Sequence, residues 1–165
     1  MKTIIFVRHA KSSWKHDVSD IDRPLKSRGI NDALLISKEL KLKNIEIDFV
    51  YTSPANRAAS TCKIFMNSLN INDDKLLIVK DLYDFGGESV LKFITSLDND
   101  YKTIMIFGHN FAFTSLINTL GDMYIDNLPT AGIAIIEFNI DSWQYVKYGH
   151  TRAIMFPKDY RSVNN

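Results

Sequence analysis

The chain has 165 residues, of which 45% are hydrophobic and 24% are charged. This composition is typical of a folded globular protein and excludes disordered, fibrous and repeat proteins. A chain of this length buries about two thirds of its unfolded surface, so we expect one core and a single domain over residues 1–165. The 20 Lys and Arg nearly balance the 19 Asp and Glu, and the formal net charge of +1 argues against a nucleic-acid partner.

The cysteine content and the short apolar runs restrict the setting of the protein. The single cysteine, Cys62, excludes an intramolecular disulfide and a zinc site made of several cysteines. No apolar stretch approaches the about 20 residues that cross a membrane, so no membrane partner is expected. The apolar run at the N-terminus meets Arg8 and His9 and is predicted to be a strand, not a signal peptide. These features predict a cytoplasmic protein and leave its oligomeric state open; a monomer is compatible with them.

Short runs rich in Ile, Val and Phe predict buried strands. In chain order they are Thr3–Val7, Asp48–Tyr51, Leu76–Val79, Thr103–Phe107 and Ile133–Phe138, with a sixth candidate at Trp143–Tyr148. Because strands that are apolar throughout are buried on both faces, they imply helices on both sides of a mostly parallel sheet. We therefore expect an α/β protein, a three-layer α/β/α sandwich. A hairpin around Asn139–Ser142 would make the last two strands an antiparallel edge.

Four stretches between the strands have the apolar spacing of helices. Their apolar faces fall within residues 30–40, 55–69, 91–97 and 113–120. Ser53 and Pro54 predict the start of the second helix, as its N-cap and first-turn residues. Gly121 predicts the end of the fourth.

Polar residues follow three of the predicted strands. Arg8 and His9 come directly after the first, the second leads into a helix whose first turn carries Arg57, and His109 follows the strand at residues 103–107. Parallel strands place their carboxyl ends at one edge of the sheet, which is where open α/β sheets bind ligands. We therefore expect these four side chains to converge, although they lie far apart in the sequence.

Such a cluster would form an anion site. Arginine presents paired planar donors that match phosphate, and helix N-termini add unpaired N–H groups. Phosphate is therefore the predicted ligand. No metal is expected, because His16 and His150 have no ligand spacing with His9 or His109, and no carboxylate pair accompanies them.

The common phosphate-handling motifs are missing from the sequence. There is no P-loop, no G-x-G-x-x-G and no G-x-S-x-G. Cys62 is not followed by an arginine six residues later, which excludes a cysteine-dependent phosphatase loop. The segment Asp20-Ile21-Asp22 follows no apolar strand and is followed by Pro24 where an aspartate-dependent phosphotransferase would have Thr or Val. By elimination, the predicted nucleophile is a histidine, which attacks phosphorus through a neutral ring nitrogen.

At this point several motifs resemble a known family. Arg8-His9-Ala10 resembles the Arg-His-Gly/Ala motif of the histidine phosphatase superfamily, whose fold is called phosphoglycerate mutase-like. Ser53-Pro54 with Arg57, and Gly108-His109-Asn110, match the later motifs of this family in the right order. More narrowly, three strings resemble the SixA-type phosphohistidine phosphatases: 8–14, 22–25 and Arg28-Gly29. The resemblance covers roughly the whole chain.

The resemblance implies roles for individual residues. His9 would be the nucleophile that becomes phosphorylated, and Arg8, Arg57 and His109 would bind the phosphoryl oxygens. No cofactor is implied.

The proton donor is open in this sequence. The superfamily often places a glutamate two residues after a leucine in mid-chain, but here Leu82-Tyr83 is followed by Asp84, with Glu88 as a rival. Further candidates for contact with phosphate or substrate are Asn110 and the residues Lys11, Ser12 and Ser13 after the nucleophile, for which a polar loop without contact is the alternative.

We therefore expect a metal-independent phosphatase that works through a phosphohistidine intermediate and acts on phosphohistidine, or another phosphorylated residue, of a protein. An imidazole leaving group, with a solution pKa of about 6.5, needs less protonation than an alkoxide, which fits the uncertain acid. Two alternatives stay open. One is a phosphatase of small phosphate esters, and the other is a phosphate-recognition module without turnover.

Overall fold

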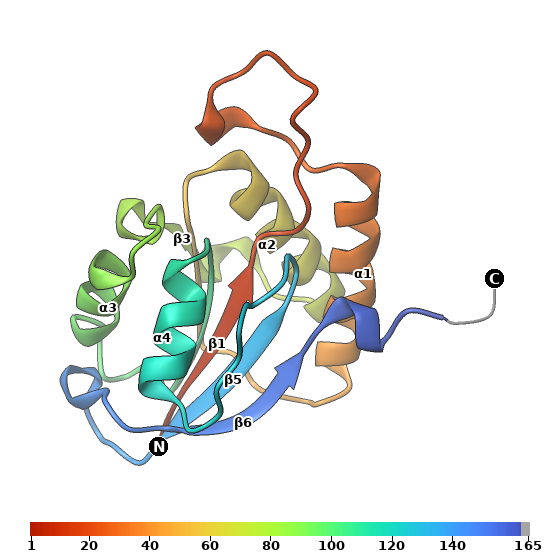
Figure 1. Ribbon diagram of the computed structural model, residues 1–165. Coiled ribbons are helices and arrows are strands. Elements are labelled where there is room, and N and C mark those ends of the chain that lie inside the picture. Colours follow the sequence, from red (N-terminus) through yellow and green to blue (C-terminus); the bar gives the residue numbers. More distant parts are fainter. Residues whose placement is uncertain (163–165) are drawn as a thin grey trace.

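Within residues 1–162, the part of the chain that the computed structural model describes, six strands form one sheet (Figure 1). The strands are β1 (Lys2–Arg8), β2 (Phe49–Thr52), β3 (Leu76–Ile78), β4 (Thr103–Gly108), β5 (Ile133–Phe138) and β6 (His150–Met155). Their order across the sheet is β3-β2-β4-β1-β5-β6. The first four run parallel, β5 is antiparallel to β1, and β6 is antiparallel to β5.

Four α-helices in the described part of the chain cover the two faces of this sheet (Figure 1). They are α1 (Ser27–Lys41), α2 (Asn56–Leu69), α3 (Glu88–Thr95) and α4 (Ala112–Leu120). Successive residues of a strand point to opposite faces. In β1, Ile5 and Val7 pack into the core that α1 and α2 cover, whereas Ile4 and Phe6 pack into the core that α3 and α4 cover. The predicted three-layer α/β/α sandwich is confirmed.

The sixth strand was predicted at the wrong place. Trp143–Tyr148 is not a strand: residues Trp143–Tyr145 form a turn of 3₁₀ helix, and β6 begins only at His150. The indole of Trp143 is fully buried, and its N–H donates to the backbone oxygen of Tyr101 at 3.0 Å. Trp143 is therefore held by burial of its side chain and one hydrogen bond, and not by the backbone pairing of a strand. The antiparallel edge exists, but the connection spans residues 139–149 instead of a tight hairpin at 139–142.

The start of the second helix also differs from the prediction. α2 begins at Asn56, and Ala55 is its N-cap residue. Ser53 lies two residues further out, where its hydroxyl accepts the N–H of Ala55 at 3.2 Å. Its side chain is thereby held at the end of β2, close to the ends of the neighbouring strands.

The strand order brings three strand ends together. β4 lies between β2 and β1, with Thr52 paired to Phe107 and Arg8 paired to Gly108. The residues that follow these strands therefore meet at one edge of the sheet, beneath a loop of residues 9–26 that projects above it (Figure 1). None of the helices in residues 1–162 is long and apolar enough to span a membrane.

The base of the projecting loop is fixed by backbone contacts. Ser13 N donates to Pro24 O at 2.8 Å, and Lys26 N donates to Lys11 O at 3.0 Å, so the two arms of the loop pair with each other. Gly29 in α1 lies directly against this base: a Cβ there would overlap Lys11 O, and would lie only 2.8 Å from Lys11 N. Only glycine lets α1 approach the loop this closely.

We predict that Gly29→Ala destabilises the protein. Alanine gains about 1 kcal/mol of helix propensity over glycine, but overpacking against fixed backbone typically costs about 1–3 kcal/mol. The net free energy of unfolding should therefore fall, as measured by urea denaturation. Asn31→Ala, at an exposed position of the same helix, gains propensity without a clash and should not destabilise. If Gly29→Ala were as stable as the wild type, or more stable, the base of the loop would be able to move away from α1 at no cost, which would contradict this prediction.

Candidate active site

His9 follows the last residue of β1 and is buried, with 7% of its surface exposed. Its Nδ1 lies 2.8 Å from the backbone oxygen of Ala10, so Nδ1 carries the hydrogen and Nε2 keeps its lone pair. Burial lowers the pKa of His9 to about 3; the charges of Arg8 and Arg57 act in the same direction, and the bond to Ala10 opposes them. The ring is therefore neutral at pH 7, with Nε2 available as a nucleophile.

His109 follows Gly108 and lies beside His9, with the ring centroids 5.3 Å apart. Its Nε2 is 2.8 Å from Ser53 Oγ. Because the Ser53 hydroxyl already accepts the N–H of Ala55, we assign its own hydrogen to the bond with Nε2, which places the hydrogen of the neutral ring on Nδ1, a buried atom that has no partner. Burial lowers the pKa of His109 to about 3, with smaller contributions in the same direction from His9 and Arg57. His109 is thus a neutral donor.

Two arginines supply positive charge beside these rings. Arg57, in the first turn of α2, is only 2% exposed, and Arg8 is the last residue of β1. Arg8 donates from Nη1 to the backbone oxygen of Leu128 at 2.8 Å. Burial, followed by the charge of Arg57, lowers the pKa of the Arg8 guanidinium. The Nε atoms of both arginines are buried and have no hydrogen-bond partner.

Asp20 is an acidic residue of the site that the sequence did not identify. Arg57 donates to it twice, from Nη1 to its backbone oxygen at 2.7 Å and from Nη2 to Oδ2 at 3.0 Å. Tyr83 donates to the same Oδ2 at 2.6 Å, and Arg23 donates to Oδ1 at 3.2 Å. The bond from Tyr83, followed by those from the two arginines, lowers the pKa of Asp20 to about 2. Its carboxylate is therefore ionised at pH 7 and forms an ion pair with Arg57.

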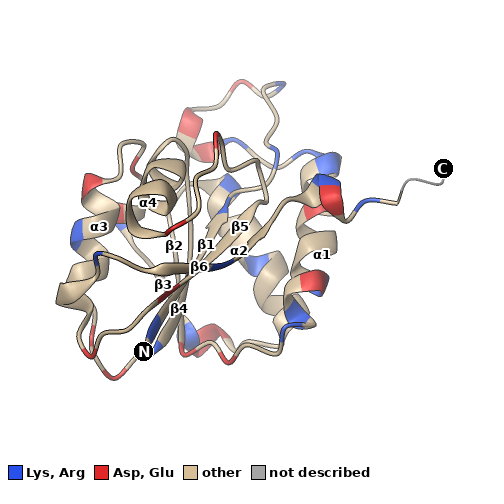
Figure 2. Cartoon of the chain, turned by 60° about the horizontal axis from the view of Figure 1, so that its bottom comes forward, with Lys and Arg blue, Asp and Glu red and all other residues tan. Residues whose placement is uncertain are grey.

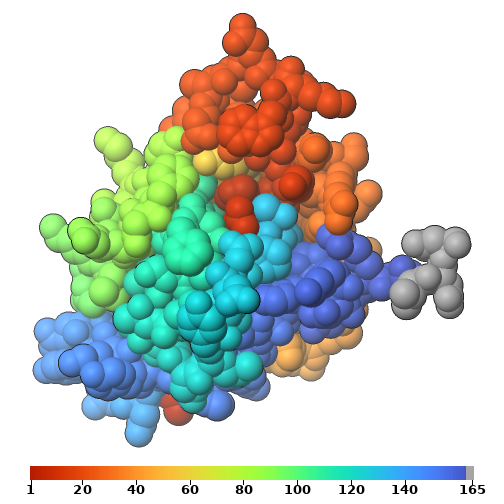
Figure 3. Space-filling view, viewed as in Figure 1, coloured from red at the N-terminus to blue at the C-terminus, as the bar shows by residue number. Residues whose placement is uncertain are grey.

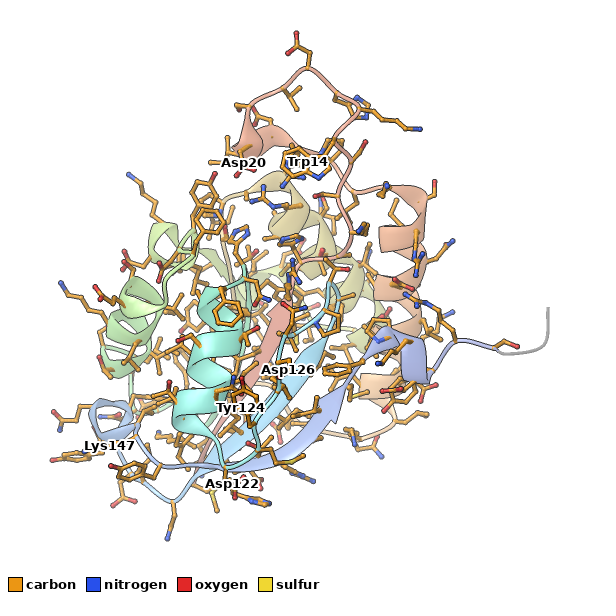
Figure 4. All side chains as sticks on the ribbon, viewed as in Figure 1. Trp14, Asp20, Asp122, Tyr124, Asp126 and Lys147 are labelled. Carbon is orange, nitrogen blue, oxygen red and sulfur yellow. The ribbon has the colours of Figure 1, made fainter. Side chains whose placement is uncertain are left out.

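A pocket of about 260 Å³ opens at this cluster. Its lining comes from the strand ends, the projecting loop and the facing segments: Arg8, His9, Lys11, Ser12, Trp14, Asp20, Arg23, Arg57, Phe85, Asn110 and Thr130. In the space-filling view the molecule is hollowed below the orange-red loop (Figure 3). Trp14 and Asp20 lie on that loop, above the sheet (Figure 4). Trp14 is 78% exposed and covers the guanidinium of Arg23, whose Cζ is 3.6 Å from the ring centroid.

The further substrate-contact candidates lie at different places. Lys11 is exposed and lines the pocket. Ser13 is not among the lining residues: its hydroxyl accepts the N–H of Lys15 at 3.1 Å, inside the loop. Its neighbour Ser12 does line the pocket and accepts a hydrogen bond from Arg23. Extended backbone explains the alternation, because successive side chains point to opposite sides.

Asn110 lines the pocket, but its amide is already engaged. Nδ2 donates to Asn127 Oδ1 at 2.8 Å and to Leu128 O at 3.1 Å, and Oδ1 accepts from Thr114. Leu128 O is also the acceptor for Arg8. Asn110 therefore fixes the segment that orients Arg8.

The two candidate acids lie outside the pocket lining. The Asp84 carboxylate accepts three backbone N–H groups at the start of α3: Gly86 at 3.0 Å, Gly87 at 3.0 Å and Val90 at 3.1 Å. A carboxylate in this position caps a helix, since it satisfies donors that the helix leaves free. Glu88 is exposed in the first turn of the same helix.

The unpartnered atoms of the protein are concentrated at this site. Among residues 1–162, the buried side-chain nitrogen and oxygen atoms without a hydrogen-bond partner are Arg8 Nε, Arg57 Nε and His109 Nδ1. Buried polar groups are nearly always hydrogen-bonded, so three such donors in one cluster indicate a site for an acceptor that comes from outside. No group of three or more His, Cys, Asp or Glu among the same residues is placed to hold a metal ion.

Comparison with known proteins agrees with these motifs. Residues 4–84 match the model of the histidine phosphatase superfamily (branch 1), a range that includes Arg8, His9 and Arg57. By this match, residues 4–84 of the chain belong to the histidine phosphatase superfamily (branch 1).

Individual proteins are similar to this chain at a distance. An uncharacterized protein of Mycobacterium tuberculosis, MT1313, is 28% identical over 140 residues, which cover 79% of this chain and 85% of that protein. The protein histidine phosphatase SixA complexed with tungstate is similar in structure, with a TM-score of 0.79 and 21% identity over 96% of this chain and 99% of that one. Phosphoglycerate mutase from Bacillus anthracis has a TM-score of 0.61 and 17% identity, covering 88% and 95%. The fold is therefore phosphoglycerate mutase-like, as predicted.

Two residues of this site escaped sequence analysis: Asp20 and Thr130, which both line the pocket. Ser12 also lines the pocket, and Ser53, which lies in one of the family-like motifs, contacts His109. Arg23 lies in the pocket between Asp20 and Trp14. The sequence carried a signal for Ser12 and Arg23, which fall within the SixA-like strings, but none for Asp20 or Thr130.

The depressed pKa values predict a pH-dependent stability. Below pH 6.5 the unfolded chain protonates its histidines, whereas folded His9 and His109 stay neutral to about pH 3. The free energy of unfolding should therefore fall as the pH drops from 6.5 towards 3, by at most about 1.4 kcal/mol per pH unit for each histidine. In urea denaturation series, His109→Gln should give a shallower slope than the wild type. His16→Gln, at an exposed position, should leave the slope unchanged; an unchanged slope for His109→Gln would refute the assignment.

The contact between Asp20 and Arg57 predicts an effect on anion binding. An incoming oxyanion must compete with the Asp20 carboxylate for Arg57 and is repelled by its charge. Asp20→Asn should therefore tighten binding of tungstate about two- to fivefold, given the modest energies of half-exposed ion pairs. Isothermal titration measures this, with Asp22→Asn in the same turn as the matched control. Weaker binding by Asp20→Asn would mean that its charge serves to orient Arg57 for the anion.

Proposed function

We propose that this member of the histidine phosphatase superfamily is a metal-independent phosphatase in which His9 Nε2 accepts the phosphoryl group. The observation that carries the proposal is the group of buried, unpartnered donors on Arg8, Arg57 and His109 beside a neutral imidazole. A phosphoryl group offers several oxygen acceptors around one phosphorus atom. It would satisfy all three donors while it exposes phosphorus to Nε2.

The reaction has two steps. In the first, the Nε2 lone pair forms a bond to phosphorus while the bond from phosphorus to the leaving group breaks, and the leaving group takes the electron pair and a proton from solvent. In the second, a water oxygen attacks the phosphohistidine and gives up a proton to solvent, the P–N bond breaks, and phosphate leaves while Nε2 regains its lone pair. His9 Nδ1 keeps its hydrogen throughout and donates it in a hydrogen bond to the Ala10 backbone oxygen, which keeps the ring oriented.

The arginines supply the charge stabilisation. Arg8 and Arg57 disfavour an imidazolium at His9 in the free protein, because like charges repel. Once phosphate enters, the same charges stabilise the equatorial oxygens of the in-line transition state. His109 Nδ1–H adds a neutral donor. Preorganised donors of this kind are typically worth about 10²–10³ each in rate.

The substrate that we propose is phosphohistidine on a protein. Asp84 caps a helix, Glu88 lies outside the pocket lining, and Asp20 is ionised, so none of them is a ready proton donor. An imidazole leaves without strong help, whereas an alkoxide does not. The structural similarity to a protein histidine phosphatase supports the same choice. Small phosphate esters are the second candidate, supported by the modest size of the pocket.

The proposal predicts that His9 carries the phosphoryl group during turnover. Rapid acid-free quenching of the enzyme with a phosphohistidine substrate, followed by mass spectrometry, should find the modification on His9. His9→Ala should reduce kcat by at least about 10³-fold, as expected when a nucleophile is removed. Arg57→Ala should raise KM and lower kcat together.

Control measurements separate the alternatives. His16→Ala removes an exposed histidine and should leave turnover unchanged. A kcat/KM for small sugar or nucleotide phosphates that exceeds the value for phosphohistidine protein by orders of magnitude would replace the substrate assignment. Wild-type protein without turnover of an aryl phosphate between pH 5 and 8 would leave a phosphate-recognition module.

A further inference from the structure

A second pocket adjoins the candidate active site. It has a volume of about 430 Å³ and shares Lys11 and Thr130 with the catalytic pocket. It lies between the N-terminal end of α1 and the segment after β6, which are joined by the ion pair of Arg161 with Asp32 at 2.7 Å. A third depression, over α1, shares Arg28, Asp32 and Arg161 with the second. The three hollows therefore adjoin one another in a row that begins at His9, and we call this row the trough.

The trough concentrates the positive charge of the chain. Its three hollows hold seven of the 20 Lys and Arg but only two of the 19 Asp and Glu. Basic segments appear at the start of α1 and in the neighbouring end of the chain (Figure 2). Because the whole chain has a net charge of only +1, the surface outside the trough is net negative.

Three of these cations are available to a ligand. Asp32 is engaged by two bonds from Arg161, and Asp20 by Arg57. Lys11, Arg28 and Lys158 are exposed and form no ion pair within residues 1–162. These three unpaired basic residues lie along the trough, beginning at the catalytic pocket. They are placed to pair with several negative charges along one ligand.

We propose that this trough binds an acidic segment of the phosphorylated protein, next to the phosphorylated residue. The inference rests on the proposed function, because it assigns the part of the substrate that extends beyond the phosphoryl group. A small phosphate ester would fill the catalytic pocket alone, whereas a peptide backbone advances about 3.3 Å per residue and would reach the second pocket within a few residues. Complementary charge would steer the acidic segment to the site and slow its dissociation.

Two peptides test the proposal: one with phosphohistidine followed by four glutamates, and one with four glutamines instead. At low salt, wild-type protein should show a kcat/KM about tenfold higher for the glutamate peptide, and most of the difference should lie in KM. The double variant Arg28→Glu, Lys158→Glu should lose this preference. Its turnover of an aryl phosphate should stay unchanged, because neither residue lines the catalytic pocket.

The matched control is Lys63→Glu with Lys92→Glu. It makes the same change in net charge at exposed positions of α2 and α3, away from the trough, and should keep the preference. Equal kcat/KM for the two peptides in the wild type, or equal losses in both double variants, would overturn the proposal.

Binding measurements separate the proposal from the proposed activity. If the wild type hydrolyses neither peptide, fluorescence anisotropy with the unphosphorylated peptides decides. Tighter binding of the glutamate peptide, lost in Arg28→Glu, Lys158→Glu, would support the trough while the phosphatase assignment fails. Equal binding of the two peptides would overturn the trough as well.

Discussion

The close approach of two arginines to a buried imidazole is the interaction on which the rest of the site depends. Burying guanidinium groups with donors left unpaired is unfavourable in the free protein. Arg8 and Arg57 nevertheless lie beside His9 at the end of the central strands. Their charges and the burial of His9 keep its ring neutral, and the same charges favour any oxyanion that enters. Under the proposed function, the cost of burying these charges would be offset when a phosphate group binds.

The projecting loop offsets part of the cost of burying these arginines. Asp20 brings a carboxylate and a backbone oxygen to Arg57 in the free protein, and Tyr83 holds that carboxylate in place. Under the proposed function, a phosphoryl group would displace at least part of this contact, so substrate binding would be an exchange of one anion for another. The loop base is fixed against Gly29 of α1, whereas the Asp20 carboxylate is nearly half exposed. The exchange therefore requires movement of a side chain and not of the whole loop.

Local sequence patterns predicted most of the fold, because its strands are apolar throughout. β5 was placed at its observed bounds, and β1, β2, β3 and β4 within one or two residues. β6 was missed because the burial of Trp143, a contact with the distant Tyr101, decides the path of the preceding segment. Sequence spacing carries no information about such a contact. The same applies to Asp20, which acts through Arg57 and Tyr83, and to the trough, whose basic residues come from both ends of the chain.

The cluster at the strand ends was accessible to sequence reasoning for a physical reason. Parallel pairing of β1 with β4 in register fixes His9 beside His109 once the strands are recognised. The proton donor was not accessible in this way, since the carboxylate of Asp84 is used to cap α3. The absence of a ready acid and the basic trough beside the site are the two features that support the proposed protein substrate with a good leaving group.

The central claim is that His9 is a neutral imidazole with its hydrogen on Nδ1. Long-range ¹H–¹⁵N correlation spectra of the protein at pH 5, assigned with His9→Gln, report the protonation and the tautomer of each ring directly. The account predicts a neutral His9 ring with a protonated Nδ1 and an unprotonated Nε2 at this pH. An imidazolium at His9, or a hydrogen on Nε2, would contradict it.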